Sequence, residues 1–596
     1  MSKLKLFFRL VKPKYLVLLT ILAIFSSWTP FISFWGLSKV IDTISAVVGS
    51  TSILLYIGLI GIFLVTNDSF EAIRWTYSTY LEGKFFLELK GILLSKVCSW
   101  PYIDIFENAV FLNKLSLAEQ SIPRFHGFFN SLAMLSSGLL GSLPFFWIGF
   151  ITSWWVPFAL MLAFLPSLLI KWNLEERLWA LEIQNGEEYK EAALHESILL
   201  SPHFAKEVRL WNAGQTILSR WKKNRTKLLT ETSGLRNKSM CLTFLASLFE
   251  GIVDCAIIVY LYTLLMSSRL SAGNFVFAIT AVTQLRQNAF TVLLFGLDIR
   301  VAFKRLLPFF DILTMNAVSR EECQVDTSGK LLVSVDKTSV PIISLYNVSF
   351  SYPGCNEKVL KNISYDIRAK EKIALVGVNG SGKTTLVKLI SGMYPLLEGN
   401  YIFKGIPYQS IDPEEFRTNF SAVYQDFAHF PLTLKENIFI SRSIQYDENA
   451  GDKNSNEENF SNLLSRFPIN NVALGPDVLL TKQMDGGLDL SGGEWQRVAL
   501  MRCAHANREI VLLDEPTASL DPDSEHDVLD TMLEIIKDKT AIIVTHRLAL
   551  CQKVDRIIVL DKGEIIETGT HAELMSLNKH YANMYRKQGD YYVSKT

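Results

Sequence analysis

The chain has 596 residues, and its 59 Lys and Arg residues balance 59 Asp and Glu residues, so the formal net charge is zero. That length favours more than one domain. Zero net charge argues against a nucleic-acid-binding protein, which needs a basic face. The seven cysteines are scattered, without metal-ligand spacing, which indicates reduced thiols rather than a disulfide framework.

Long apolar runs fill the first half of the chain, and an ordinary globular composition follows from about residue 300. A spanning helix needs about 20 mostly apolar residues. We therefore expect an all-α transmembrane domain over residues 1–316. Its six predicted helices lie at about 15–37, 53–75, 127–151, 154–172, 240–266 and 275–300.

Basic residues concentrate in the N-terminus and in segments 84–126 and 171–238, whereas the connections on the other side carry only Lys39 and Arg269. Because cytoplasmic loops are enriched in Lys and Arg, both termini are predicted to be cytoplasmic, in a multi-pass protein of the cytoplasmic membrane. The two basic segments are predicted to extend the spanning helices toward a soluble domain.

Three charged residues are predicted to lie near the middle of the membrane. Glu250 and Asp254 are one turn apart on the fifth helix, so they share a face, and Arg286 lies on the sixth. Charges at this depth are costly. Two interpretations stay open: Arg286 pairs with one of the acids to close the bundle, or the three groups line a wet cavity for a polar or cationic substrate.

The second half begins after a polar stretch at 317–340, which is predicted to be a linker. From residue 341 to 596 short β-rich runs alternate with helical ones, the pattern of an α/β domain. Residues 377–384, Gly-Val-Asn-Gly-Ser-Gly-Lys-Thr, match the P-loop pattern between a predicted strand and a predicted helix. The residues expected to bind the phosphates of ATP are Gly377, Asn379, Gly380, Ser381, Gly382, Lys383, Thr384 and Thr385.

Two acids follow an apolar strand at residues 510–513. Asp514 suits the Mg²⁺ shell together with the Thr384 hydroxyl, and Glu515 is placed to polarise the attacking water. Alone, such a pair is more often a solvated strand end. The P-loop about 130 residues earlier favours the catalytic interpretation.

A second anion site is predicted at Ser491, Gly492 and Gly493, which precede a helical run. One domain needs a single such site for one nucleotide. Two facing copies need both, because each copy supplies the P-loop for one ATP and the serine-glycine turn for the other. The intact motifs favour a second copy of the chain as the partner, with a heterodimer as the alternative.

With these motifs in place, the whole chain resembles an ABC transporter of the exporter type. The resemblance implies that Tyr352 stacks on adenine and that Gln425 touches Mg²⁺. It also implies that Gln496 belongs to the signature turn, that Asp521 lies in a loop crossing the dimer interface and that His546 contacts the γ-phosphate. The implied catalytic residues are Glu515, His546, Lys383 and Gln425, and the implied metal-binding residues are Thr384, Gln425 and Asp514. The expected cofactors are ATP and Mg²⁺.

Two cytoplasmic segments, 102–108 and 205–211, resemble the family's coupling elements, which dock near the glutamine loop. The alternative is that both are ordinary amphipathic helices. One departure is noted: residues 481–487 lack the Thr-x-Val-Gly-Glu-x-Gly stretch found in many exporters before the signature.

The ATPase half, including Trp495 inside the signature, also looks like that of bacterial lantibiotic and related peptide exporters. This resemblance implies ATP-driven export of a modified peptide by alternating access. The alternative cargo is a lipid or a drug, and a third hypothesis is an ATP-gated channel or regulator. The presence of Glu515 and His546 argues against the third, since gating alone would tolerate their loss.

Overall fold

The computed structural model describes residues 13–45, 51–125, 127–315, 341–440, 453–469, 475–516 and 522–593. The chain divides into two compact units. The helical unit comprises Met1–Lys96 and Lys114–Met315, and the α/β unit comprises Val97–Asn113 and Asn316–Thr596. The α/β unit therefore includes a short segment from the first half of the sequence. The predicted linker at 317–340 lies outside the described residues.

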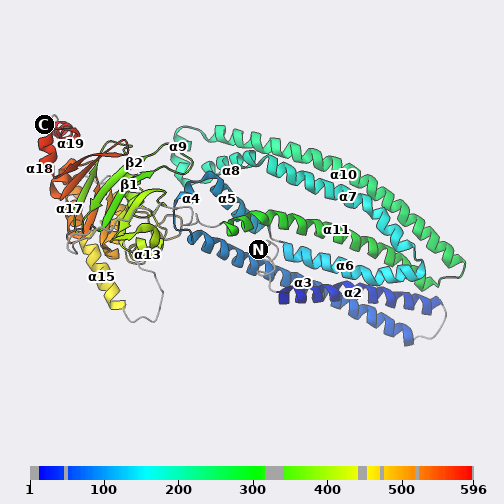
Figure 1. The fold of residues 1–596 in the computed structure, drawn as a ribbon. Coiled ribbons are helices and arrows are strands. Elements are labelled where there is room, and N and C mark those ends of the chain that lie inside the picture. Colours follow the sequence, from blue (N-terminus) through cyan, green and yellow to red (C-terminus); the bar gives the residue numbers. More distant parts are fainter. Residues whose placement is uncertain are drawn as a thin grey trace. The chain divides into compact units, whose positions relative to one another are not determined.

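Long helices make up the helical unit (Figure 1). They are α2 (Pro13–Ser45), α3 (Thr51–Cys98), α5 (Ala109–Arg124), α6 (Phe128–Thr152), α7 (Val156–Gln184), α8 (Gly186–Leu200), α9 (Ala205–Leu210), α10 (Gly214–Met266) and α11 (Ala272–Thr314). The first residues of α5 belong to the α/β unit, as does the short α4 (Asp104–Glu107).

Five of the described helical stretches are long and apolar enough to cross a membrane: Pro13–Ser45, Ile53–Cys98, Phe128–Trp147, Val156–Leu181 and Gly214–Met266. They overlap the first five spans expected from the sequence, and they contain those at 15–37, 53–75 and 240–266. The sixth expected span lies in α11, which does not meet this criterion and carries charged residues such as Arg286 and Asp298. That span stays a prediction.

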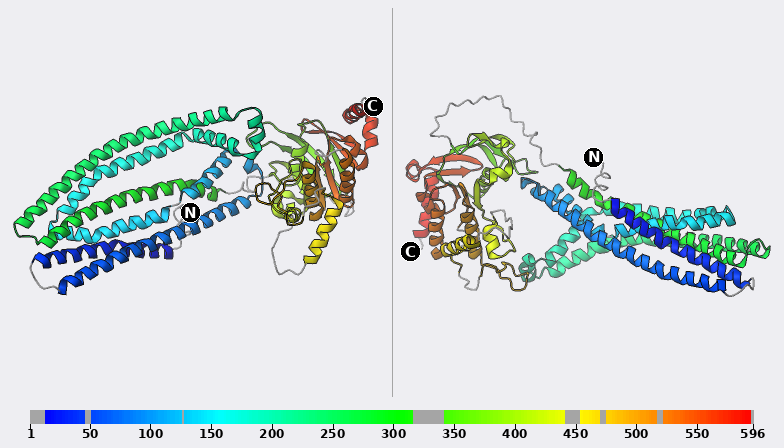
Figure 2. Two further views of the ribbon diagram at one scale, coloured as in Figure 1. Left: turned by 180° about the vertical axis from the view of Figure 1, so that it is seen from behind. Right: turned by 90° about the horizontal axis from the view of Figure 1, so that it is seen from below.

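Two sets of helices pack inside the helical unit. α6 packs on α11 and on α2, and α7 packs on α10, while α11 joins the sets through contacts with α7 and α10. Figure 2 shows α10 and α7 running side by side. Gly141 allows α6 to approach α2 closely, because a Cβ there would lie 2.8 Å from the Ser27 Cβ. Small residues let membrane helices approach in this way.

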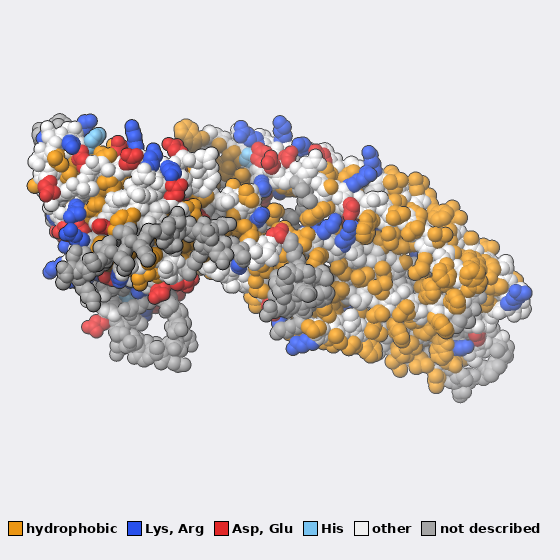
Figure 3. Space-filling model, viewed as in Figure 1, with side chains coloured by type: hydrophobic (Ala, Val, Ile, Leu, Met, Phe, Trp, Pro, Cys, Tyr) orange, Lys and Arg blue, Asp and Glu red, His pale blue; other side chains and the backbone are white. Residues whose placement is uncertain are grey.

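Large apolar side chains face outward from the helical unit. Figure 3 shows them gathered over the helices, and Leu64, Leu162 and Ile252 are among the most exposed. Water would disfavour so large an apolar surface, whereas lipid chains would cover it. The surface therefore agrees with a protein that crosses a membrane several times.

The main sheet of the α/β unit has the strand order β10-β9-β3-β8-β7-β6. β9, β3, β8, β7 and β6 are parallel, and β10 pairs antiparallel at one edge. The strand bounds are β3 (Lys372–Val376), β6 (Phe420–Val423), β7 (Ile510–Asp514), β8 (Thr540–Val544), β9 (Arg556–Asp561) and β10 (Glu564–Gly569). β7 and β8 are buried along their whole length, as expected for parallel strands covered on both faces.

A second, antiparallel sheet has the order β2-β1-β4-β5. Its strands are β1 (Ile343–Phe350), β2 (Leu360–Ile367), β4 (Glu398–Phe403) and β5 (Ile406–Pro407). One core lies between the two sheets around α12, and another lies under α14 to α17. The helices of this unit are α12 (Lys383–Ile390), α13 (Pro413–Arg417), α14 (Leu434–Phe439), α15 (Lys453–Arg466), α16 (Gly492–Ala506), α17 (Pro522–Ile535), α18 (His571–Leu577) and α19 (His580–Val593).

Candidate functional site

Four neighbouring parallel strands bring most of the candidate residues to one edge of the main sheet. The P-loop follows β3, His546 follows β8, Asp514 and Glu515 end and follow β7, and Gln425 follows β6. The order β3-β8-β7-β6 makes these ends adjacent. Ligands of open α/β sheets bind at this carboxyl edge.

The P-loop is a tight turn between β3 and α12. A Cβ at Gly377 would lie 2.1 Å from the Leu560 carbonyl oxygen, so a larger residue cannot take this place without a shift of the backbone. Gly382 precedes α12 with φ of 101°, a left-handed conformation that favours glycine. The backbone N–H groups at the start of α12 thereby face outward from the turn, which is the arrangement that binds phosphate. Asn379 and Gly380 are exposed at its tip, whereas Ser381 is buried.

Lys383 begins α12 and is buried. Its Nζ donates hydrogen bonds of 3.0 Å to the carbonyl oxygens of Gly377 and Val378. Burial lowers the pKa of this ammonium group, while Glu515 and Asp514 act in the opposite direction. The ammonium group is thus held inside the phosphate loop that it would neutralise.

Asp514 is fully buried, and neither of its carboxylate oxygens has a hydrogen-bond partner of ordinary geometry among the described residues. Burial raises the pKa of this carboxyl, with Glu515 adding to the shift, and the Thr384 hydroxyl and Lys383 oppose it. An unpartnered buried carboxylate beside a hydroxyl is a donor set that suits Mg²⁺, a hard cation with oxygen ligands. The residues present therefore fit the metal that the sequence motif implies.

Glu515 lies between two other candidate residues. Its Oε2 accepts a hydrogen bond of 3.2 Å from the Gln425 side-chain amide, and its Oε1 lies 2.8 Å from His546 Nε2. Its φ is 49°, a left-handed conformation that is uncommon for a residue with a side chain. Strained backbone of this kind concentrates at functional sites. The carboxylate is thereby aimed between the glutamine loop and the histidine.

The hydroxyl groups of Tyr352 and Thr385 form a hydrogen bond of 2.8 Å. The ring that is predicted to stack on adenine therefore adjoins the start of α12. The ring also packs edge-on against Tyr394, with centroids 5.7 Å apart. Sequence reasoning missed Tyr394, because no motif marks it.

Ser491 caps α16. Its hydroxyl accepts from the Glu494 backbone N–H, and Glu494 Oε2 accepts from the Ser491 backbone N–H, so the two residues form a capping box. Gly492 and Gly493 form the first turn. The Gln496 side-chain amide donates to the Pro516 carbonyl oxygen, which ties this helix to the residue that follows Glu515. Asp521 and the rest of its predicted loop lie outside the described residues.

The segment Val97–Asn113 packs within the α/β unit beside this site. The Ile103 N–H donates to the Met393 carbonyl oxygen at 2.9 Å, and the Tyr394 hydroxyl donates to Glu107 Oε1 at 2.5 Å. Arg417 donates to the Pro101 carbonyl oxygen at 2.6 Å. The segment that resembles a coupling element therefore contacts the residues that follow α12 and, through Tyr394, the ring of Tyr352.

Comparisons with known proteins agree with this geometry. Residues 360–518 match the family model for the ABC transporter. Subtilin transport ATP-binding protein SpaT of Bacillus subtilis is 27% identical over 97% of this chain and 92% of its own length. Nisin transport ATP-binding protein NisT of Lactococcus lactis subsp. lactis is 26% identical over 98% of this chain and 95% of its own length. The fold also matches the structure of a bacterial Atm1-family ABC exporter with ATP bound, with a TM-score of 0.75, 21% identity and coverage of 97% and 98% of the two chains.

The α/β unit is thus the nucleotide-binding, ATP-hydrolysing domain of an ABC transporter. The whole chain has the fold of an ABC exporter, in which a helical unit with several membrane-span candidates and the ATPase domain lie in one polypeptide.

Proposed function

We propose that two copies of this chain export a modified peptide across the cytoplasmic membrane, driven by ATP hydrolysis. The hydrolytic part of the proposal rests on one observation: the Glu515 carboxylate lies between Gln425 and His546, at the strand edge that carries the P-loop. The cargo class is supported by two relatives that align over nearly the whole chain and are described as transporters of subtilin and nisin. Both chain termini would be cytoplasmic, as the distribution of basic residues predicts.

In the proposed reaction the P-loop N–H groups and Lys383 hold the β- and γ-phosphates, and Tyr352 stacks on adenine. Glu515 accepts a proton as the water oxygen bonds to the γ-phosphorus, and ADP leaves with the electrons of the broken P–O bond. His546 and Gln425 orient that carboxylate and the γ-phosphate. Asp514 and Thr384, with Gln425, would hold Mg²⁺, which neutralises charge on the phosphates.

The second copy completes each ATP site in this proposal. The N-terminus of α16, capped by Ser491, presents free N–H groups of its first turn to an anion. A single chain has one P-loop and one such turn, so pairing them across two copies uses both. ATP then holds the two ATPase domains together, and hydrolysis with phosphate release separates them, which alternates the access of the membrane cavity.

A groove on the ATPase domain supports this pairing. Its volume is about 400 Å³, and its lining includes Arg417, Arg502, Arg508 and Phe420. On α9 and its ends, the apolar side chains of Leu210 and Trp211 are exposed beside the acid Glu207. α9 also carries Lys206 and Arg209, and the groove carries Glu414, so each surface combines both signs of charge with apolar groups that could match the other. We therefore assign α9 of the second copy to this groove.

The test of the proposed hydrolysis is Glu515→Gln. Turnover of ATP should fall by at least about a hundredfold, because the proton acceptor is lost, whereas ATP binding should persist. With ATP bound, the purified variant should sediment as a stable dimer. Glu509→Gln is the matched control, since Glu509 lies just before β7 and pairs with Lys404 at the surface. Normal turnover in Glu515→Gln, or a monomer in the presence of ATP, would contradict the proposal.

The cargo is tested separately in vesicles that contain the wild-type protein. A lantibiotic-type precursor peptide should raise ATP turnover and should accumulate in the compartment opposite the ATPase domains. A fluorescent lipid in the same vesicles should not be moved. Lipid movement without peptide transport would replace the peptide by the alternative cargo and leave the ATPase assignment intact.

A further inference from the structure

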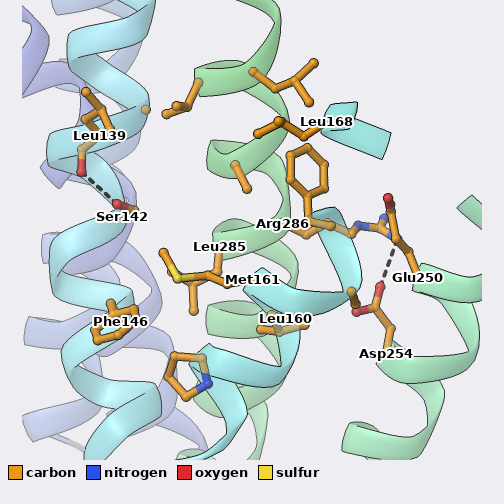
Figure 4. A pocket seen from close by; sticks show the side chains of 17 residues that line it. Leu139, Ser142, Phe146, Leu160, Met161, Leu168, Glu250, Asp254, Leu285 and Arg286 are labelled. Carbon is orange, nitrogen blue, oxygen red and sulfur yellow. Dashed lines mark hydrogen bonds and ion pairs between the residues drawn. The ribbon is translucent and has the colours of Figure 1, made fainter. Parts of the chain in front are cut away.

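A cavity of about 310 Å³ lies inside the helical unit, between α6, α7, α10 and α11 (Figure 4). Most of its walls are apolar, and they include the aromatic rings of Phe146 and Phe164. Three ionisable residues line the cavity, and they are Glu250, Asp254 and Arg286. An apolar pocket with a few convergent polar groups is the usual form of a ligand site.

Arg286 reaches from α11 toward the two acids on α10, as Figure 4 shows. Its Nη1 lies 2.9 Å from Asp254 Oδ2, so the pairing expected from the sequence forms with Asp254. Asp254 is largely covered, with 17% of its side chain exposed. In this ion pair Asp254 and Arg286 neutralise each other's charge.

Glu250 is the acid that remains. Its Oε1 accepts a hydrogen bond from the neutral Ser167 hydroxyl on α7. No Lys, Arg or His in the described part of the chain lies within ion-pair distance of it. Lys171 is near enough to act on Glu250 through space, but its ammonium group lies over the Phe290 ring at 4.2 Å and does not line the cavity.

The charges on the cavity wall therefore do not balance: two carboxylates face one guanidinium group. A carboxylate at membrane depth is expensive unless a cation pairs with it, and the Lys171 ammonium group, although near Glu250, makes no ion pair with it. An anion would meet Glu250 without gaining a free guanidinium, because Arg286 is engaged by Asp254. A cation would gain the Glu250 carboxylate, and an apolar body attached to it would contact the apolar walls.

We propose that this cavity binds a cationic group carried on an apolar body, with Glu250 as the counter-ion. The ligand class is an ammonium or guanidinium group flanked by hydrophobic surface, such as a basic residue in an amphipathic peptide. The inference rests on the proposed export function for its biological meaning, because the occupant would be a part of the cargo.

The test compares two lipophilic ions of nearly the same shape and opposite charge, tetraphenylphosphonium and tetraphenylborate. Binding of each to the purified full-length protein in lipid nanodiscs is measured by equilibrium dialysis, with protein-free nanodiscs subtracted. The wild type should bind the phosphonium at least tenfold more tightly than the borate. Glu250→Gln should lose at least tenfold of the phosphonium affinity and none of the borate affinity.

Two further variants serve as controls: one removes an acid that lies outside the cavity, and the other fills the cavity. Glu176 lies on α7, pairs with Arg300 and Lys304, and does not line the cavity, so the Glu176→Gln variant should bind both ions as the wild type does. Ala289→Phe fills the cavity and should weaken both ions. Size-exclusion profiles and basal ATP turnover verify that each variant is folded.

Equal affinity for the two ions, or unchanged phosphonium binding in Glu250→Gln, would overturn the cavity assignment while leaving ATP turnover intact. An inactive wild-type ATPase with charge-selective binding would instead contradict the proposed function alone. If Glu250→Gln does not fold, the Ala289→Phe result decides: wild-type phosphonium binding in that variant would overturn the proposal.

Discussion

The ATPase domain and the helical unit differ in how the positions of their candidate functional residues are determined. In the ATPase domain the candidate residues lie at the ends of buried parallel strands, so the backbone itself sets their positions. In the helical unit the same kind of apolar residue faces outward, and Arg286 of α11 finds its partner Asp254 on α10 through side chains alone. Sequence motifs therefore locate the ATP site, whereas the cation site that we propose depends on the three-dimensional arrangement of the helices.

The largest expected effect tests the ATPase side of this contrast. Lys383→Ala should lower ATP turnover by at least about a hundredfold, because it removes a preorganised positive charge from the phosphate loop. Turnover and the affinity for a fluorescent ATP analogue report the loss. Lys358→Ala is the control, since Lys358 pairs with Glu398 at the surface. Turnover within threefold of the wild type would exclude Lys383 from the site.

A matched pair of core substitutions compares the two units directly. Leu512→Ala in β7 leaves a cavity in a fully buried sheet and should cost about 2–5 kcal/mol of unfolding free energy. Leu64→Ala on α3, where 57% of the residue is exposed, should cost less than about 1 kcal/mol, because lipid surrounds either side chain. Thermal unfolding of the full-length protein in nanodiscs measures both. Equal losses would mean that Leu64 is buried in the assembled protein.

The sequence could predict much of the ATPase site for a physical reason. Asp514 ends the apolar strand β7 and Glu515 follows it, while Lys383 closes the glycine-rich loop after β3, so their place at the sheet edge follows from local pattern. The contact between Glu107 and Tyr394 joins residues 287 positions apart and follows no motif, so no local pattern reveals it. The unusual φ of Glu515 likewise depends on the tertiary fold, because its N–H bonds to Val544 on the neighbouring strand.

Loss of the hydrogen bond between Tyr394 and Glu107 should have a smaller effect. Tyr394→Phe removes the donor to Glu107 and should weaken the docking of residues 97–113 by about 1–3 kcal/mol. Faster hydrogen exchange in that segment should report the change, together with less peptide transported per ATP hydrolysed. Tyr346→Phe is the control, because Tyr346 is exposed on β1. Unchanged exchange in both variants would show that the hydroxyl contributes nothing to the docking.

The smallest expected effect concerns pH. Burial raises the pKa of the Asp514 carboxyl, so protons compete with Mg²⁺ at a higher pH than they would for a solvated aspartate. Affinity for ATP in the presence of Mg²⁺ should therefore fall as the pH is lowered toward that raised pKa. ATP binding measured with a chelator should show a weaker dependence. Identical pH profiles with and without Mg²⁺ would argue against Asp514 as a metal ligand.

The segment Val97–Asn113 has a consequence for anyone who isolates the ATPase. A polypeptide cut to residues 341–596 would lack this segment, which covers Met393 and supplies the acceptor for the Tyr394 hydroxyl. The apolar surface that this segment covers would then be exposed to solvent, which would favour self-association of the fragment. The ATPase domain is therefore discontinuous in sequence. A fragment that keeps its native surface would have to include residues 97–113 together with residues 341–596.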